Sequence, residues 1–290
     1  MKVLVTGASG QLGKELRATV PEQVELIAAN RAQFDISQLD SVERIVSQHQ
    51  PDLIINAAAY TAVDQAESDS DTAYAINERG VANLAAAAKS IGARLIHIST
   101  DFVFDGEQSH SYLPSDATHP CSVYGASKRA GELILQQQMP TDSLIIRTAW
   151  VYSADGSNFV NTMLRLMASQ PQLTVVTDQI GTPTWAKKLA EVIWLFSQQP
   201  SASGIYHWTD SGVASWYDFA VAIQEEALAC GLLEQAIAII PVTSDHYSTA
   251  AKRPAFSLLS KTSSLELLQL EACHWRHCLR QMLQQKVSSN

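Results

Sequence analysis

Residues 6–13 read Thr6-Gly7-Ala8-Ser9-Gly10-Gln11-Leu12-Gly13, with glycines spaced as G-x-x-G-x-x-G. This stretch follows a short apolar run over residues 2–6 and precedes a helical pattern from Gln11 to about Val20. Glycines let the backbone approach a bound pyrophosphate, and the free N–H groups at a helix start attract negative charge. The strand–turn–helix context therefore predicts a dinucleotide-binding turn rather than an ordinary glycine turn.

Beyond this turn, apolar runs and helical patterns alternate through the first half of the chain. Strands are expected over residues 24–29, 53–57, 95–99 and 144–148, and helices over residues 40–48, 73–90 and 122–138. This alternation is typical of right-handed βαβ crossovers, which build a parallel sheet. Further strand patterns follow at 173–176 and 204–207, separated by longer irregular segments.

The rhythm changes after about Trp150, where the strands and helices no longer alternate evenly. A capping box at Ser215-Trp-Tyr-Asp218 predicts a helix over 216–229. We expect a dinucleotide-binding domain over residues 1–150 and a smaller substrate-binding lobe over 151–290, partly interleaved with the main sheet. The predicted fold class is α/β, with a Rossmann-like doubly wound parallel sheet and a smaller C-terminal α/β lobe.

The composition is that of a globular protein and excludes several other classes. Of 290 residues, 46% are apolar and 17% are charged, so the chain can bury a sizeable core. A net charge of −9 argues against a nucleic-acid partner, although a local pocket can still bind an anionic ligand. The apolar runs are too short for a membrane span or a signal peptide, and the four cysteines form no disulfide framework. A cytoplasmic protein without a membrane partner is expected.

The residue after the second strand bears on the choice of nicotinamide cofactor. An acidic side chain there favours NAD(H) by accepting a hydrogen bond from the adenosine ribose, but this chain has Asn30-Arg31. Arg31 is either a partner for a 2′-phosphate or a solvated charge, so the sequence favours NADPH and tolerates NADH. Asp35 and Ile36 are candidates for lining the adenine. The small side chains of residues 57–59 would let the backbone approach the cofactor.

Tyr124 and Lys128 form a Y-x-x-x-K pair within the helix predicted over 122–138. Their i,i+4 spacing places both side chains on one face of the helix. A free tyrosine has a pKa of about 10, and a nearby ammonium group lowers that pKa. Tyr124 is therefore expected to protonate a carbonyl oxygen while hydride reaches the carbon, and Lys128 to contact the nicotinamide ribose. The alternative is an unrelated Tyr and Lys on the surface of an amphipathic helix.

Two segments supply candidates for substrate contacts. Thr100 and Asp101 directly follow the strand predicted over 95–99, and ligands of open α/β sheets bind beyond the carboxyl ends of strands. Thr100 is a candidate for orienting the carbonyl toward Tyr124, and Asp101 either contacts a sugar, assists proton delivery or is only a turn residue. Arg253 is interpreted as a clamp for a substrate diphosphate or as a solvated loop charge.

The segment Cys273–Cys278 holds two cysteines and two histidines and invites a zinc interpretation. On a helix, however, its two end residues lie roughly 140° apart, so the four side chains cannot converge on one ion. Structural zinc sites also use wider ligand spacing. An amphipathic helix with buried cysteine and Trp275 is favoured, and no metal ligand is predicted.

Together these motifs resemble the extended short-chain dehydrogenase/reductase family, and in particular its rhamnose branch, over nearly the whole chain. The motifs are Val-Thr-Gly-Ala-Ser-Gly-Gln-Leu-Gly (5–13), Asn-Ala-Ala-Ala-Tyr-Thr-Ala-Val-Asp (56–64), Ser-Thr-Asp-Phe-Val-Phe-Asp-Gly (99–106), Val-Tyr-Gly-Ala-Ser-Lys (123–128), Arg-Thr-Ala-Trp-Val-Tyr (147–152), Asp-Gln-Ile-Gly-Thr-Pro-Thr (178–184) and Arg-Pro-Ala-Phe-Ser (253–257). The second, third and fifth are specific to that branch. Phe102 and Ala149 depart mildly from the family pattern, where Tyr and Ser are usual.

The resemblance implies that NAD(P)H reduces the C4 ketone of dTDP-4-dehydro-L-rhamnose, with this nucleotide sugar as the partner of the chain. It implies a catalytic set of Thr100, Tyr124 and Lys128. It places Asp101 and Trp150 against the deoxysugar; without the resemblance, Trp150 is better interpreted as a core aromatic. The implied cofactor contacts, beside Gly7 and Gly13 of the turn, are Gly10, Gln11, Leu12, Asn30, Asp35, Ile36, Ala58, Ala59, Tyr60, Tyr124 and Lys128.

Some family members hold Mg²⁺ at a dimer interface through glutamates. Glu15 matches one such position, but Lys187 stands at another, and a cation opposes metal binding there. The resemblance is compatible with a homodimer, but the departure at Lys187 argues against Mg²⁺ and against a dimer that depends on it. Two rival functions are open: a nucleotide-sugar epimerase or dehydratase that retains NAD, and a non-catalytic regulatory subunit. The missing acid after the second strand disfavours the first, and the presence of Thr100, Tyr124 and Lys128 disfavours the second.

Overall fold

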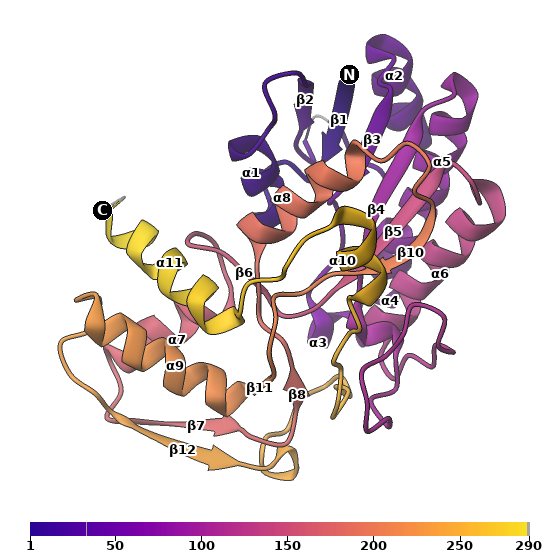
Figure 1. The fold of residues 1–290 in the computed structure, drawn as a ribbon. Helices are drawn as coiled ribbons and strands as arrows, with labels where there is room; N and C mark the ends of the chain where they lie inside the picture. Colours follow the sequence, from indigo (N-terminus) through magenta and orange to yellow (C-terminus); the bar gives the residue numbers. More distant parts are fainter. Residues whose placement is uncertain (33, 289–290) are drawn as a thin grey trace.

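Six parallel strands form the central sheet of the computed structural model, which describes residues 1–32 and 34–288 (Figure 1). Their order across the sheet is β10-β5-β4-β3-β1-β2. The strands are β1 (Lys2–Thr6), β2 (Glu25–Ala29), β3 (Leu53–Asn56), β4 (Arg94–Thr100), β5 (Ser143–Thr148) and β10 (Gly204–His207). The strand order reverses between β1 and β3, and ligands of such sheets bind at the carboxyl ends beside this point.

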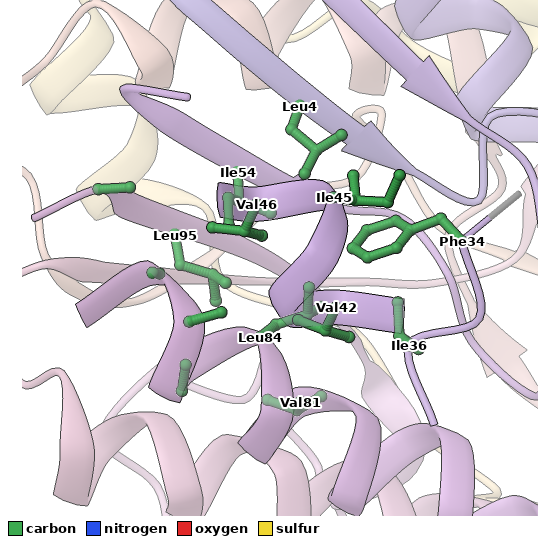
Figure 2. Close-up of a cluster of buried hydrophobic side chains, with 14 of the residues drawn as sticks. Leu4, Phe34, Ile36, Val42, Ile45, Val46, Ile54, Val81, Leu84 and Leu95 are labelled. Carbon is green, nitrogen blue, oxygen red and sulfur yellow. The ribbon is translucent and has the colours of Figure 1, made fainter. Parts of the chain in front are cut away.

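Helices cover both faces of the sheet. One face is covered by α2 (Leu39–His49), α5 (Gly80–Ile91) and α6 (Val123–Gln138). The other is covered by α1 (Gln11–Ala18), α8 (Ala186–Ser197) and α10 (Thr262–Leu268). Figure 2 shows Leu4, Ile54 and Leu95 of the sheet packed against side chains of α2 and α5. The sheet is buried on both faces, which explains why its strands are continuous apolar runs in the sequence.

The strands and helices expected in the first half are confirmed to within a few residues, with one local difference. The helix expected over 73–90 is divided: α4 (Ser70–Tyr74) leads through a π-helical turn (Ala75–Arg79) into α5. The buried Asn77 lies in this turn, and its side chain bonds both the N–H and the carbonyl of Tyr60. A π-helical turn re-aims one side chain without ending the helix. The short α3 (Val63–Ala66) precedes α4.

A second group of elements packs around its own core at the lower left of Figure 1. It contains α7 (Phe159–Met167), α9 (Trp216–Ala229), α11 (Trp275–Ser288) and the parallel pair β7 (Gln172–Val176) and β12 (Ala238–Val242). Short pairs lie between this group and the main sheet: β6 (Val151–Tyr152) with β9 (Thr184–Trp185), and β8 (Ile180–Gly181) with β11 (Ala214–Ser215). The capping box that starts α9 is confirmed, since Ser215 and Asp218 bond each other's backbone N–H. Within the described ranges, every helix is too short or too polar to cross a membrane.

Candidate active site

A cleft of about 510 Å³ lies beyond the carboxyl ends of β3, β4 and β5, beside the glycine turn. Its wall combines the start of α1, the end of β4, the first turns of α6 and the segment that follows β5. The predicted site residues that line it are Gly10, Gln11, Leu12, Ala59, Thr100, Asp101, Tyr124, Lys128, Trp150 and Arg253. The sequence therefore identified residues that are far apart along the chain and that the fold brings to one cleft.

The glycine turn has the local geometry that a dinucleotide needs. Gly7 has a φ of +65°, and a Cβ on Gly13 would lie 2.2 Å from the carbonyl oxygen of Gly7. Helix α1 begins at Gln11 without a side-chain cap and without an acid in its first turn. Its first N–H groups are thus left for a negatively charged ligand. The turn fits the pyrophosphate of a dinucleotide cofactor.

The Gln11 side chain forms hydrogen bonds with residues outside the glycine turn. Its Oε1 accepts hydrogen bonds from Ser153 Oγ and Asn158 Nδ2, both at 2.8 Å. These contacts join the glycine turn to the loop that precedes α7.

The residues that line the cleft do not include the other predicted cofactor residues: Gly7, Gly13, Asn30, Asp35, Ile36, Ala58 and Tyr60. The Asp35 carboxylate accepts hydrogen bonds from the N–H and hydroxyl of Ser37, and the Ile36 side chain lies in the core against Gly80. Tyr60 donates its hydroxyl hydrogen to Asp69 over 3.3 Å. Their roles as cofactor contacts stay predictions.

Thr100, Asp101 and Tyr124 meet where β4 ends and α6 begins. Thr100 is the last residue of β4, and its Oγ1 donates to Asp101 Oδ1 at 3.0 Å. Helix α6 starts after Ser122, whose hydroxyl caps the N–H of Gly125 at 3.1 Å. This cap sets Tyr124 in the first turn and Lys128 one turn later, on the face predicted from their spacing.

The pKa values in this group depart from ordinary ones because the groups are removed from water. Burial raises the pKa of Asp101 to about 6, against hydrogen bonds from Ser257 and Thr100 that lower it. Burial raises the pKa of Tyr124 to about 12, partly offset by a hydrogen bond with Thr100. Burial lowers the pKa of Lys128 to about 8, while Glu132 acts to raise it. Tyr124 therefore keeps its proton at neutral pH.

The expectation that Lys128 lowers the pKa of Tyr124 is wrong for this structure. The Lys128 Nζ donates to the carbonyl oxygen of Ile98 at 2.6 Å and lies 3.3 Å from Nε2 of His97. The groups that act on Tyr124 are its own burial, Thr100 and Asp101. The ammonium group therefore points toward β4 instead of stabilising a phenolate.

Trp150, which lines the cleft, stands in a constrained conformation. Its φ is +48°, which non-glycine residues rarely adopt. Its ring stacks on Trp216 at 3.6 Å with an interplanar angle of 9°, and a Cβ on Gly181 would lie 2.6 Å from it. Strain of this kind is maintained only where the surroundings determine the conformation, and it is often found at ligand sites.

Trp216 also borders a second cavity of about 250 Å³ in the second group of elements. Aromatic and aliphatic side chains form much of its wall, and Arg253 stands at its boundary with the main cleft. Its lining residues are Phe159, Met163, Thr174, Val175, Val176, Gln179, Trp216, Tyr247, Thr249 and Arg253. The two cavities thus share Trp216 and Arg253.

Arg253 is partly exposed and forms an ion pair. Its Nη2 and Nη1 donate to Asp64 Oδ2 at 2.6 Å and Oδ1 at 3.1 Å. Asp64, in α3, also accepts from the N–H of Ala251 at 3.1 Å, and its pKa is lowered mainly by the hydrogen bond with Arg253. The pair attaches the segment before α10 to the first half of the chain beside the cleft.

The features considered as metal sites have other partners. Burial and the charges of Asp155 and Glu191 raise the pKa of Glu15, and the charge of Lys187 acts to lower it. The expected absence of Mg²⁺ stays a prediction. Among residues 1–32 and 34–288, no cluster of three metal-ligating side chains occurs. Trp275 and Cys278 are buried as expected, but α11 begins at Trp275. The prediction that Cys273 belongs to this helix is therefore wrong.

Several residues of the site were not identified in the sequence: Asp64, Asn77, His97, Trp216 and Ser257. Asp64 lay inside a quoted motif, and Trp216 directly follows the capping serine. His97 interrupts an otherwise apolar strand, which is a signal that a polar group has a buried partner. Ser257 ended the quoted motif over 253–257, and no local pattern distinguishes Asn77.

Comparisons with known proteins agree with this geometry. The family model described as the RmlD substrate binding domain matches residues 1–288. The spore coat polysaccharide biosynthesis protein SpsK of Bacillus subtilis (strain 168) is 46% identical over 290 residues, covering 99% of each chain. A dTDP-4-dehydrorhamnose reductase of Aggregatibacter actinomycetemcomitans is 41% identical over 286 residues, covering 96% of this chain and 97% of that protein. A dTDP-4-dehydrorhamnose reductase from Bacillus anthracis, solved in complex with NADP, has a TM-score of 0.91 at 36% identity, covering 97% of this chain and 98% of that one.

Proposed function

Since the chain belongs to the family of the RmlD substrate binding domain, we propose that it reduces the C4 ketone of dTDP-4-dehydro-L-rhamnose to give dTDP-L-rhamnose. The chain is an NAD(P)H-dependent oxidoreductase with a Rossmann-like fold. The identity of the sugar and the nucleotide, and the role of each side chain, are parts of the proposal.

The observation that carries the proposal is the continuity of one cleft from the glycine turn to the end of β4 and the start of α6. A cofactor whose pyrophosphate lies on α1 would extend toward Tyr124 and Lys128. A carbonyl substrate bound beside Trp150 would then meet both the cofactor and the phenol. The bound cofactor would supply the hydride.

The side chains then divide the remaining tasks. Tyr124, which burial keeps protonated, donates its proton to the carbonyl oxygen as negative charge develops there. Thr100 orients that oxygen, Asp101 binds the sugar, and Lys128 contacts the ribose of the cofactor. Trp150 offers apolar surface to the C–H groups of the deoxysugar.

The second cavity is the proposed place of the nucleotide. Its lining includes Phe159, Trp216 and Tyr247, whose rings suit a planar base. Arg253 lies at the boundary with the sugar site, where a diphosphate would bridge the two cavities. This assignment gives the segment after residue 150 the role of substrate-binding lobe.

Two wider aspects of the function are also proposals. We propose that the product serves cell-surface polysaccharide synthesis, which the name of the Bacillus subtilis relative supports. A homodimer independent of Mg²⁺ stays a prediction, which sedimentation with and without the metal would test.

The experiment compares the wild-type chain with Tyr124→Phe. NADPH oxidation is followed with dTDP-4-dehydro-L-rhamnose generated in situ, and NADPH binding is measured in parallel. The proposal expects turnover that Tyr124→Phe reduces at least about a hundredfold without loss of NADPH affinity. Absence of turnover with intact NADPH binding would refute the substrate. Purification with stoichiometric tightly bound NAD would instead favour an epimerase or dehydratase.

A further inference from the structure

A chain of buried polar side chains runs beneath the cofactor cleft, from β1 to α6. Thr6 Oγ1 donates to Asn56 Oδ1 at 2.7 Å, and Asn56 Nδ2 lies 3.0 Å from His97 Nδ1. Nε2 of His97 lies 3.3 Å from Lys128 Nζ. All four side chains are at most 1% exposed. The chain crosses β1, β3 and β4 next to the point where the strand order reverses.

The proton positions in this chain depend on the charge of Lys128. An ammonium group can only donate, so a charged Lys128 requires Nε2 of His97 to accept and Nδ1 to carry the hydrogen. In the structure Asn56 Nδ2 faces Nδ1, and Asn56 Oδ1 accepts from Thr6 Oγ1 and, at 3.2 Å, from the N–H of Ala58. A hydrogen on Nδ1 requires the amide to turn its oxygen toward the ring, and Thr6 Oγ1, 3.3 Å from the same N–H, is then the acceptor for Ala58. If the Asn56 NH₂ group faces Nδ1, then Nδ1 accepts and the His97 ring carries its hydrogen on Nε2. That arrangement suits an uncharged Lys128 amine. The Thr6 hydroxyl at the far end can donate or accept, so it suits both arrangements.

We propose that His97 is a positioning residue for Lys128, which it holds through Nε2 and keeps charged at neutral pH. This inference rests on the proposed contact between Lys128 and the cofactor ribose. The Ile98 carbonyl is the other acceptor for Nζ, at 2.6 Å. Loss of the Nε2 acceptor would leave a buried ammonium group with one protein hydrogen bond from three donors.

The other ionisable groups around Lys128 do not replace this acceptor. Glu132, on the same helix, raises the pKa of Lys128 through its charge, but its carboxylate is bound by Arg147 and Arg129. Tyr124 lies one turn earlier and keeps its proton. His97 is fully buried, and burial and Lys128 lower its pKa well below the ordinary value, so it stays neutral and can accept.

Three substitutions of His97 separate its two hydrogen bonds. A glutamine amide can occupy the position of Nε2 and face Lys128, whereas an asparagine amide reaches only the position of Nδ1 and faces Asn56. His97→Leu removes both contacts. The readout is the dissociation constant of NADPH across pH, measured by fluorescence titration, which requires no sugar substrate. A wrong sugar assignment therefore leaves this test unaffected.

Wild type is expected to lose NADPH affinity as pH rises past the point where Lys128 loses its charge. His97→Gln should keep this alkaline transition near its wild-type position. His97→Asn and His97→Leu should move it about one to two pH units lower, the effect of losing one hydrogen bond to a charged group. The proposal is overturned if Asn keeps the wild-type transition, or if Gln shifts it as far as Leu does.

A measurement on the wild type covers the case in which the variants do not fold. The ¹⁵N chemical shifts of the His97 ring distinguish the protonated nitrogen from the unprotonated one. Below the alkaline transition, Nε2 should be unprotonated and Nδ1 protonated. A ring that carries its hydrogen on Nε2 at every pH would contradict an ammonium group donating to it.

Discussion

Asp64→Asn is expected to strengthen substrate binding, because Asp64 and a substrate diphosphate would compete for Arg253. The asparagine removes the negative charge but keeps an oxygen that can accept from the N–H of Ala251. The Asp64 side chain is 47% exposed and that of Arg253 is 23% exposed. An ion pair this accessible contributes at most about 1 kcal/mol. Releasing Arg253 from it should lower the KM for dTDP-4-dehydro-L-rhamnose by up to about fivefold.

Arg253→Ala supplies the opposite change and the control. Loss of a charge-assisted contact to the diphosphate should raise the KM about tenfold to a hundredfold, corresponding to about 1.5–3 kcal/mol. In the Arg253→Ala background, Asp64→Asn should have no further effect, and a double-mutant cycle over the initial-rate assay measures this coupling. A KM that rises in Asp64→Asn as it does in Arg253→Ala would refute the competition. The ion pair itself would then be what the substrate requires.

Three further predictions concern the constrained ring and the buried charges. The Cβ of Gly181→Ala would lie 2.6 Å from the Trp150 ring, so the ring should move by roughly 0.8 Å. This shift should lower kcat/KM about tenfold to a hundredfold. The NADPH affinity, measured by fluorescence titration, should not change. Burial raises the pKa of Asp101 from 3.8 to about 6 in the folded chain. Between these pH values the folded chain keeps a proton on Asp101 that the unfolded chain has lost. The free energy of unfolding therefore falls by about 3 kcal/mol as the pH rises through this range. Asp101→Asn should remove this loss and be more stable than wild type to urea at pH 8 but not at pH 4. Arg147→Leu should destabilise the chain by about 3–5 kcal/mol in urea unfolding, because Glu132 is completely buried beside it.

Each of these predictions has a result that would contradict it. Full activity in Gly181→Ala would mean that the ring position does not matter for turnover. Equal stabilities of Asp101→Asn and wild type at pH 8 would mean that the buried carboxylate carries no penalty. A change below about 1 kcal/mol in Arg147→Leu would mean that Arg129 alone satisfies Glu132.

The central sheet could be predicted because its two-sided burial makes each strand a continuous apolar run with a short turn at its end. The glycine turn and the Tyr124–Lys128 pair are likewise local patterns, and each is set by a helix start that the sequence marks. Elements of the second half were less predictable. Strand β10 lies where the pattern over 204–207 predicts a strand, whereas helix α8, which packs against the main sheet, was not predicted.

The candidate site shows the same limit. Residue types and spacing identified the groups at strand ends, but not the partners that determine how they behave. The pairing of Arg253 with Asp64 joins positions 189 residues apart, and the direction of Lys128 depends on a histidine two strands from the glycine turn. Burial also decided the sign of the Tyr124 pKa shift, because desolvation outweighs every other effect on its hydroxyl. Spacing along the chain contains no information about desolvation.

The most direct test of the proposed reaction follows the hydride itself. NADPH carrying deuterium at the transferred position is incubated with the wild-type chain and dTDP-4-dehydro-L-rhamnose, and the product is analysed by mass spectrometry and NMR. We expect dTDP-L-rhamnose with one deuterium, located at C4, and formation of this labelled product at least about a hundredfold more slowly by Tyr124→Phe. Deuterium at another carbon, or unlabelled product formed without consumption of NADPH, would contradict it.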